Sequence, residues 1–135
     1  MDEVPKSLTI LTAPLLSKKL KSLNVSDNAL GEAGVKGLSD FLTNSKSLTE
    51  LRISNCGLGP SGASLLFVTI KNLDLSVIKI GRNRLENVGA EAFSIYLHNK
   101  INLASVSIKQ NGIRKEGMDA FLTELVTHTN LKVYK

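Results

Sequence analysis

The stretch Leu48-Thr-Glu-Leu51-Arg-Ile53-Ser-Asn-Cys56-Gly-Leu58 decides the fold, because its spacing of apolar and small residues recurs along the chain. Matching stretches begin at Leu20, Leu75 and Leu103, and a shorter copy begins at Leu131. Successive copies start 27 or 28 residues apart. A fixed period of this length is typical of solenoid proteins, in which each copy forms one supersecondary unit and packs against its neighbours.

Two patterns follow one another within each copy. In the first copy, Leu23 and Val25 alternate with polar residues, which predicts a short strand with one buried face. After each strand a glycine recurs in phase, and apolar residues spaced three and four apart follow it. This spacing predicts one amphipathic helix in each repeat, over residues 32–43, 60–71, 87–98 and 115–127.

The copies match the leucine-rich repeat pattern L-x-x-L-x-L-x-x-N/C-x-L. The sequence therefore predicts an α/β leucine-rich repeat solenoid, a horseshoe segment of about four and a half repeats with a parallel inner sheet and outer helices. Residues 6–17 resemble the helix of an earlier repeat, interrupted at Pro14. We expect a single domain over 1–135 without polar terminal caps, an uncovered edge strand over 131–134, and self-association through these ends.

Composition narrows the class of protein further. The 135 residues, 42% hydrophobic and 21% charged, suit one packed domain, and 22 leucines against 6 Phe and Tyr predict an aliphatic core. The single cysteine excludes an internal disulfide, and no apolar run approaches the length of a membrane span. The net charge of +5 allows an acidic partner. Nucleic acid is not expected, because the predicted binding face lacks stacking aromatic residues.

One polar column occupies the same position in every repeat, directly after the strand. We predict that its members point inward and satisfy backbone groups of the loops that have no partner in the sheet. Cys56 replaces the amide in the second repeat, and we favour a buried structural position for it over a reactive thiol. The ladder column consists of Asn28, Cys56, Asn83 and Asn111.

Motifs for catalysis or metal binding find no support in the sequence. Residues 57–62 spell G-x-G-x-x-G, but these glycines belong to the repeat columns and no acidic residue follows the next strand. His98 and His128 lie near predicted helix C-termini, where the helix dipole explains them better than chemistry does. We therefore expect no metal site, no cofactor and no catalysis by this chain alone.

A second polar column directly precedes the first and is predicted to form a row on the rim where strands lead into helices. Exposed strand positions beside it carry basic residues, which predict one basic patch on the concave face, with scattered solvated charge as the alternative. We favour a protein-binding role for this face over a merely solvated surface. The rim row is Asp27, Asn55, Arg82 and Gln110, and the basic patch is Arg52, Lys79, Arg82 and Lys109.

Four segments carry a family resemblance. They read LNVSDNALG over 23–31, SNCGLGP over 54–60, GRNRLEN over 81–87 and QNGIRKEG over 110–117. Their residues and their order closely resemble the consecutive repeats of Ran GTPase-activating proteins, and the segment over 81–87 is the most specific to that family. The similarity extends in register from about Asp2 to Val133 and covers about the N-terminal half of the family's horseshoe.

The resemblance implies a regulator of an enzyme, one that stimulates GTP hydrolysis by GTP-bound Ran in nucleocytoplasmic transport. It also implies a cytoplasmic location, with the nuclear envelope as a narrower option. Members of this family use an asparagine on the rim to arrange the catalytic groups of the GTPase itself, and the matching residue is Asn55. Two alternatives stay open: an interaction scaffold without activating function, and a purely local turn role for Asn55.

Overall fold

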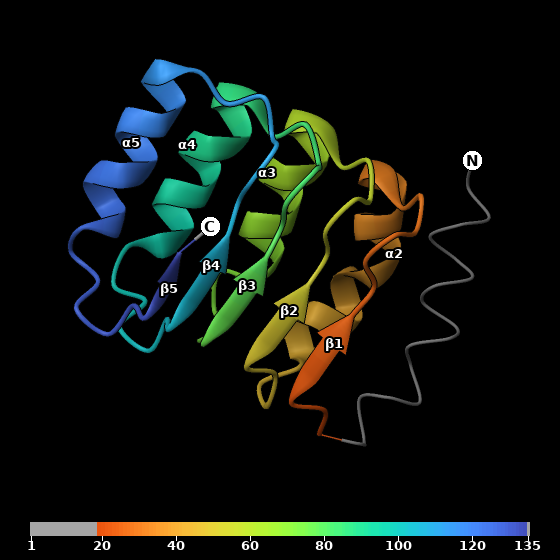
Figure 1. The fold of residues 1–135 in the computed structure, drawn as a ribbon. Coiled ribbons are helices and arrows are strands. Elements are labelled where there is room, and N and C mark those ends of the chain that lie inside the picture. The colour runs from red at the N-terminus through yellow and green to blue at the C-terminus, as the bar shows by residue number, and fades with distance from the viewer. Residues whose placement is uncertain (1–18, 135) are drawn as a thin grey trace.

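The structure is a computed structural model and describes residues 19–134. Within this range, strands and helices alternate, and all the strands form one parallel sheet in chain order (Figure 1). The strands are β1 (Ser22–Asn24), β2 (Glu50–Arg52), β3 (Val77–Lys79), β4 (Ser105–Ser107) and β5 (Val133–Tyr134). The helices are α2 (Gly31–Asn44), α3 (Gly59–Thr69), α4 (Glu86–Leu97) and α5 (Lys115–Leu125).

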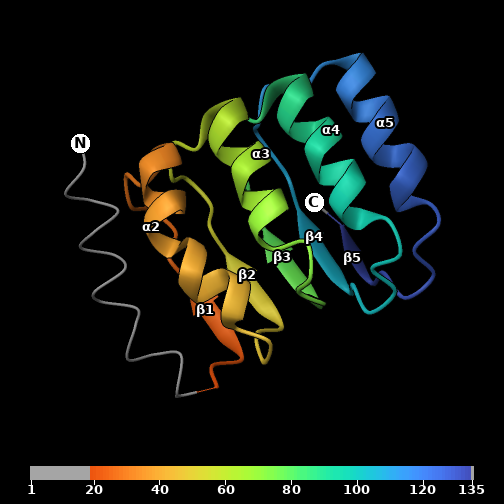
Figure 2. The ribbon, with the colours of Figure 1, turned by 180° about the vertical axis from the view of Figure 1, so that it is seen from behind.

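The helices form a single layer behind the sheet and leave its other face open, as the view from behind shows (Figure 2). Each strand pairs in parallel with its sequence neighbour, so that Leu51 lies opposite Leu23 and Ile78 opposite Leu51. The prediction of a solenoid with a parallel inner sheet and outer helices is confirmed. The helix bounds agree with the expected ones to within two residues.

The structure tests the expected elements at only one of the two ends of the chain. The helix expected over 6–17 lies outside the described residues. At the other end, the expected edge strand is present but shorter, since only Val133 and Tyr134 pair with β4. β5 is the outermost strand on that side of the described sheet. Self-association through this edge stays a prediction.

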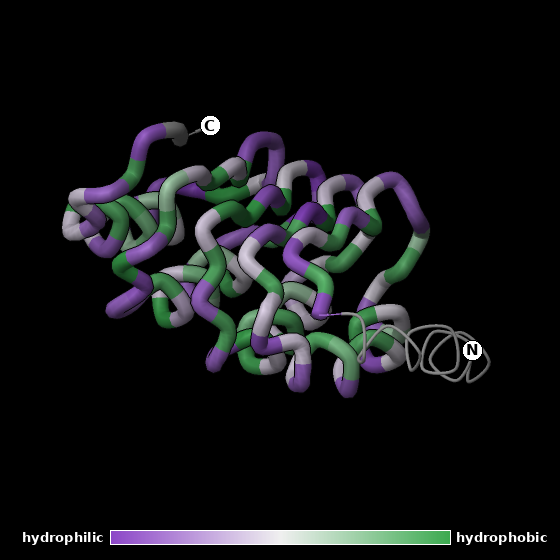
Figure 3. Tube along the Cα trace, turned by 90° about the horizontal axis from the view of Figure 1, so that it is seen from below, coloured by the Kyte–Doolittle hydropathy of each residue, from purple (hydrophilic) through white to green (hydrophobic). Residues whose placement is uncertain are grey.

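The core lies between the sheet and the helix layer. Inward strand residues such as Leu51, Ile78 and Val106 are fully buried, as expected for an aliphatic core. On the helix side the mostly aliphatic core also contains one buried phenylalanine from each helix, and those of α3, α4 and α5 form a row of aromatic rings. The ring centroids of neighbouring repeats lie 4.5 and 5.3 Å apart along Phe67, Phe93 and Phe121. Hydrophobic segments accordingly recur in every repeat of the tube in Figure 3.

The glycine that recurs at each helix start has a packing role. A Cβ atom on Gly117 would lie 2.9 Å from the Cα atom of Asn87 in the preceding repeat. A Cβ atom on Gly62 would lie 3.4 Å from the Cα atom of Glu32. Glycine therefore lets the first turns of neighbouring helices approach closely, which sets the tight spacing of the rim.

Candidate functional site

The ladder column builds the floor beneath the rim. Asn83 is fully buried, and its Nδ2 atom donates to the carbonyls of Ile53 at 2.7 Å and Ile80 at 3.1 Å, while its Oδ1 atom accepts the backbone N–H of Cys56 at 2.8 Å. Asn111 repeats this arrangement one repeat later and accepts the backbone N–H of Asn83 at 2.7 Å. The predicted inward orientation is confirmed for both residues. Each side chain ties its own repeat to the preceding one.

The two other ladder residues differ. Cys56 is buried as predicted, its thiol donates to the carbonyl of Val25 at 3.2 Å, and burial raises the pKa of the thiol above its ordinary value. Asn28 is exposed, but it fulfils the predicted role of satisfying backbone groups of its loop. Its Nδ2 atom still donates to the carbonyls of Val25 and Ser26 in its own loop, at 2.9 and 3.1 Å. No described repeat precedes Asn28, so its side chain bonds only within its own repeat.

All four rim residues share one backbone conformation. Asp27, Asn55, Arg82 and Gln110 have φ angles of 63°, 53°, 57° and 58°, in the left-handed region. This turn directs the ladder residue into the core and leaves the residue before it exposed. Backbone N–H groups of the rim still bond to the next repeat, as in the 2.9 Å contact from Asn55 to the carbonyl of Gly81.

The rim side chains form two hydrogen-bonded pairs. Asn55 donates through Nδ2 to Oδ1 of Asp27 at 2.9 Å, and Arg82 donates through Nε to Oε1 of Gln110 at 2.8 Å. The predicted row of neighbouring polar side chains is therefore present. Because the Asn55 amide contacts a side chain of the neighbouring repeat, it is not occupied by a bond within its own turn.

A shallow depression of about 300 Å³ lies at the centre of this rim. Lys79 and Lys109 of the open sheet face line it together with Asp27, Asn55 and Arg82. The depression thus brings an uncharged carboxamide and one carboxylate next to basic side chains. Such a surface suits a partner that presents both hydrogen-bonding groups and negative charge.

Two of the predicted partner-binding residues lie beside the depression instead of lining it. Gln110 contacts it only through its hydrogen bond to Arg82. Arg52 lies opposite Lys79 in the sheet register, and its Nη2 atom lies 3.8 Å from a carboxylate oxygen of Glu50. The basic side chains are therefore neighbours, with Arg52 partly balanced by an acidic residue of its own strand.

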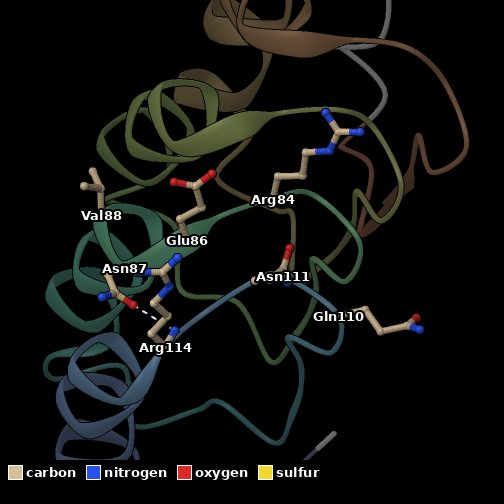
Figure 4. Close-up of a pocket in the computed structure, with 8 residues that line it drawn as sticks. Arg84, Glu86, Asn87, Val88, Gln110, Asn111 and Arg114 are labelled. Carbon is tan, nitrogen blue, oxygen red and sulfur yellow. Dashed lines mark hydrogen bonds between the residues drawn. The ribbon is translucent and has the colours of Figure 1, made fainter.

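A second hollow, of about 440 Å³, lies farther along the rim near the starts of α4 and α5, and sequence reasoning did not identify it. Arg84, Glu86 and Arg114 line it, and the Arg114 backbone N–H donates to Oδ1 of Asn87 at 2.9 Å (Figure 4). Arg84 and Glu86 both have a φ of 55°. The sequence indicated these positive φ angles, because the second repeat has glycine, the residue that adopts them most readily, at the two equivalent positions.

Other candidate chemistry is not supported within residues 19–134. No cluster of His, Cys, Asp and Glu there could hold a metal ion, and no helix there has the length and apolarity to cross a bilayer. The expected contact with a helix C-terminus is found for His128, whereas His98 contacts an acidic side chain. His128 Nε2 lies 2.8 Å from the carbonyl of Leu97, and His98 Nδ1 lies 3.2 Å from a carboxylate oxygen of Glu124.

Comparison with known proteins agrees with this geometry. The family model described as "Leucine Rich repeat" matches residues 16–39 and 44–67. The chain has the fold of a leucine-rich repeat solenoid segment. A solved structure described as leiomodin-1 actin-binding site 2 shares this fold, with a TM-score of 0.75 over 98% of this chain and 76% of that chain, at 13% sequence identity.

Curated relatives identify the kind of repeats. The chain is 34% identical to a Ran GTPase-activating protein of Drosophila melanogaster over 98% of its own length, and 36% identical to Ran GTPase-activating protein 1 of Xenopus laevis over 82%. A relative of the same name in Saccharomyces cerevisiae is 34% identical over 87% of the chain. The resemblance is confirmed. The chain spans 22 to 32% of the length of these relatives.

Proposed function

We propose that this chain contributes the rim surface of a GTPase activator that acts on GTP-bound Ran. The observation that supports the proposal most directly is the similarity of almost the whole chain to Ran GTPase-activating proteins, together with an exposed Asn55 on the rim. Such a protein regulates an enzyme and needs no cofactor of its own. A cytoplasmic location, including the cytoplasmic side of the nuclear envelope, belongs to the same proposal.

The chemistry explains why a carboxamide is useful here. GTP hydrolysis needs a positioned water molecule and stabilisation of the charge that develops on the phosphate oxygens. Asn55 can both donate and accept hydrogen bonds without adding charge, so it can orient a side chain of the GTPase that holds the water. Its amide group already donates to Asp27, and none of the described residues donates to its Oδ1 atom. The Oδ1 atom therefore remains available for a donor of the partner.

The basic side chains supply the second part of the surface. Lys79, Arg82 and Lys109 line the same depression as Asn55. Long-range attraction between charges of opposite sign accelerates encounter and fixes orientation more than it adds affinity. We assign these residues to docking an acidic region of the GTPase, next to the point where Asn55 acts.

Single-turnover hydrolysis of GTP by Ran tests the proposal. The assay uses this chain, and also a chimera in which it replaces the aligned segment of the Drosophila relative. Asn55→Gly is the preferred variant, because glycine accepts the φ of 53° that would strain alanine. We expect it to slow stimulated hydrolysis about a hundredfold or more, as for the loss of one preorganised transition-state contact.

A matched control separates function from folding. Asn99 is also exposed and has a φ of 63°, but it lies after α4, at the opposite edge of the repeats. Asn99→Gly should leave stimulated hydrolysis unchanged. If the chimera binds Ran but does not stimulate hydrolysis, the chain is an interaction scaffold. If Asn55→Gly and Asn99→Gly have the same effect on stimulated hydrolysis, Asn55 has only a structural role in its turn.

A further inference from the structure

The outer surface of the helix layer carries ion pairs on its two outer helices but no charge on α3 between them. α2 and α5 carry ion pairs on their exposed faces, Glu32 with Lys36 at 3.4 Å and Lys115 with Asp119 at 2.6 Å. α3, in contrast, contains no charged residue over Gly59–Thr69. The exposed outer face of α3 is therefore uncharged, and it combines the small polar Ser61 with Val68, a large apolar side chain that remains open to solvent.

A groove lies between α3 and α4 on this outer surface, with a volume of about 290 Å³. Its walls are Val68 and Ile95, which remain 64% and 79% exposed, and its floor is formed by the nearly buried rings of Phe67 and Tyr96. Exposed large apolar side chains on both walls of one hollow are typical of interaction surfaces. We call this feature the α3–α4 groove.

The charged residues that line the groove are basic. Lys71, His98 and Lys100 line one end, and none of the described lining residues is acidic. Lys100 is held in place there, because its Nζ atom donates to the carbonyl of Lys71 at 2.6 Å and lies 4.9 Å from the centre of the Tyr96 ring. Two acidic side chains lie near the groove without lining it. Glu124 contacts His98 at 3.2 Å on the side facing α5, and the charge of Asp74 acts on the phenol of Tyr96 and favours its protonated form.

We propose that the α3–α4 groove docks an amphipathic, acidic peptide segment of a partner protein, with one large apolar side chain in the hollow and a carboxylate beside Lys71 and Lys100. The hollow lies at the lower limit of small-molecule sites, which begin near about 300 Å³, and suits a single anchoring side chain. A second copy of this chain is a poor occupant, because the net charge of +5 and the lysines of two grooves would repel each other.

This surface is separate from the rim. Each helix runs back from the rim, so the C-terminal ends of α3 and α4, which carry Val68 and Tyr96, lie at the opposite edge of the repeats (Figure 1). A peptide in the groove therefore leaves Asn55 accessible. The two sites can be occupied together, and variants of one can be tested independently of the other.

Peptide display on this chain tests the proposal. A library of randomised 12-residue helical peptides is selected against the wild-type chain and counter-selected against Ile95→Glu. We expect enriched peptides to combine a large apolar residue with Asp or Glu close to it, and to bind the wild type at least about tenfold more tightly than Ile95→Glu. Replacing both Lys71 and Lys100 by alanine should weaken binding about tenfold and remove its salt dependence.

Val126→Glu is the matched control, because Val126 is 80% exposed on the outer surface beyond the groove. It should bind the selected peptides as the wild type does. The proposal is overturned if no peptide distinguishes wild type from Ile95→Glu, or if the selected sequences show no acidic bias. Self-association of the free chain that Ile95→Glu abolishes in sedimentation would assign the groove to a second copy and would also overturn it.

Discussion

The side chain of Asn83 joins two repeats, because its Oδ1 atom accepts the backbone N–H of Cys56 at 2.8 Å while its Nδ2 atom donates to the carbonyl of Ile53 at 2.7 Å. Both partners belong to the preceding repeat, at the point where β2 ends and the loop to α3 begins. The loop carrying Asn55 therefore has a buried anchor on either side of it, so the exposed rim residue is presented by a rigid turn.

Asn83→Ala should destabilise the protein strongly. The substitution leaves the carbonyl of Ile53 and the N–H of Cys56 buried without this partner, whereas the carbonyl of Ile80 keeps a bond from Asn111 at 3.0 Å. Each unsatisfied buried group costs about 1–3 kcal/mol. We expect a loss of about 3 kcal/mol or more in the free energy of unfolding by urea. Asn28→Ala is the control, because Asn28 is exposed, and it should lose less than about 1 kcal/mol. Equal losses for the two variants would contradict this account of the ladder.

Cys56→Asn should stabilise the protein. The thiol of Cys56 is a weak donor, at 3.2 Å from the carbonyl of Val25, whereas an amide supplies two strong donors and an acceptor. We expect a gain of about 1 kcal/mol in unfolding free energy relative to wild type, and a loss for Cys56→Ala. If asparagine proves less stable than alanine here, the site is fitted to the smaller side chain and not to hydrogen bonding.

The sequence predicted the repeats, the helices and the residues of the rim, because all of these follow from a period that can be counted. It did not predict which rim side chains pair, since Asp27 with Asn55 and Arg82 with Gln110 are contacts between repeats that depend on the exact stagger. The sequence also did not predict the α3–α4 groove. Apolar residues at helical spacing predict a buried face, and only the packed helix layer shows that Val68 and Ile95 remain outside.

Arg84→Gly and Glu86→Gly should each stabilise the fold. Both residues adopt φ angles of 55°, which cost a side-chain-bearing residue about 1 kcal/mol, and Gly57 and Gly59 occupy the same positions of the second repeat. We expect the double variant to gain about 1–2 kcal/mol in unfolding free energy. Gly57→Ala supplies the converse control and should lose stability. No gain in the double variant would mean that the charged side chains make compensating contacts.

The stability of the wild type should fall at high pH because of Tyr96. Burial raises the pKa of its phenol above the ordinary value of 10.0, and the hydroxyl donates to the carbonyl of Leu73 at 3.1 Å. Below pH 10 the phenol is protonated in both states, so its contribution is fully present. Above that value the unfolded state loses the proton first, and stability declines with rising pH. Thermal unfolding of wild type and Tyr96→Phe between pH 8 and 11 should show a steeper decline for the wild type, and parallel curves would contradict it.

Asp27 should act on the proposed reaction through Asn55. The Oδ1 atom of Asp27 accepts a hydrogen bond from Nδ2 of Asn55 at 2.9 Å. This bond holds the Asn55 carboxamide in one orientation, which leaves the Oδ1 atom of Asn55 directed toward the partner. Asp27→Ala in the chimera should therefore slow single-turnover GTP hydrolysis by Ran about tenfold at saturating activator, with little change in the concentration needed for saturation. Combining it with Asn55→Gly should add almost nothing, because residues that act as a unit give non-additive losses. Fully additive losses in the double variant would show that Asp27 contacts the GTPase on its own, and a loss confined to binding would show that it serves docking and not the orientation of Asn55.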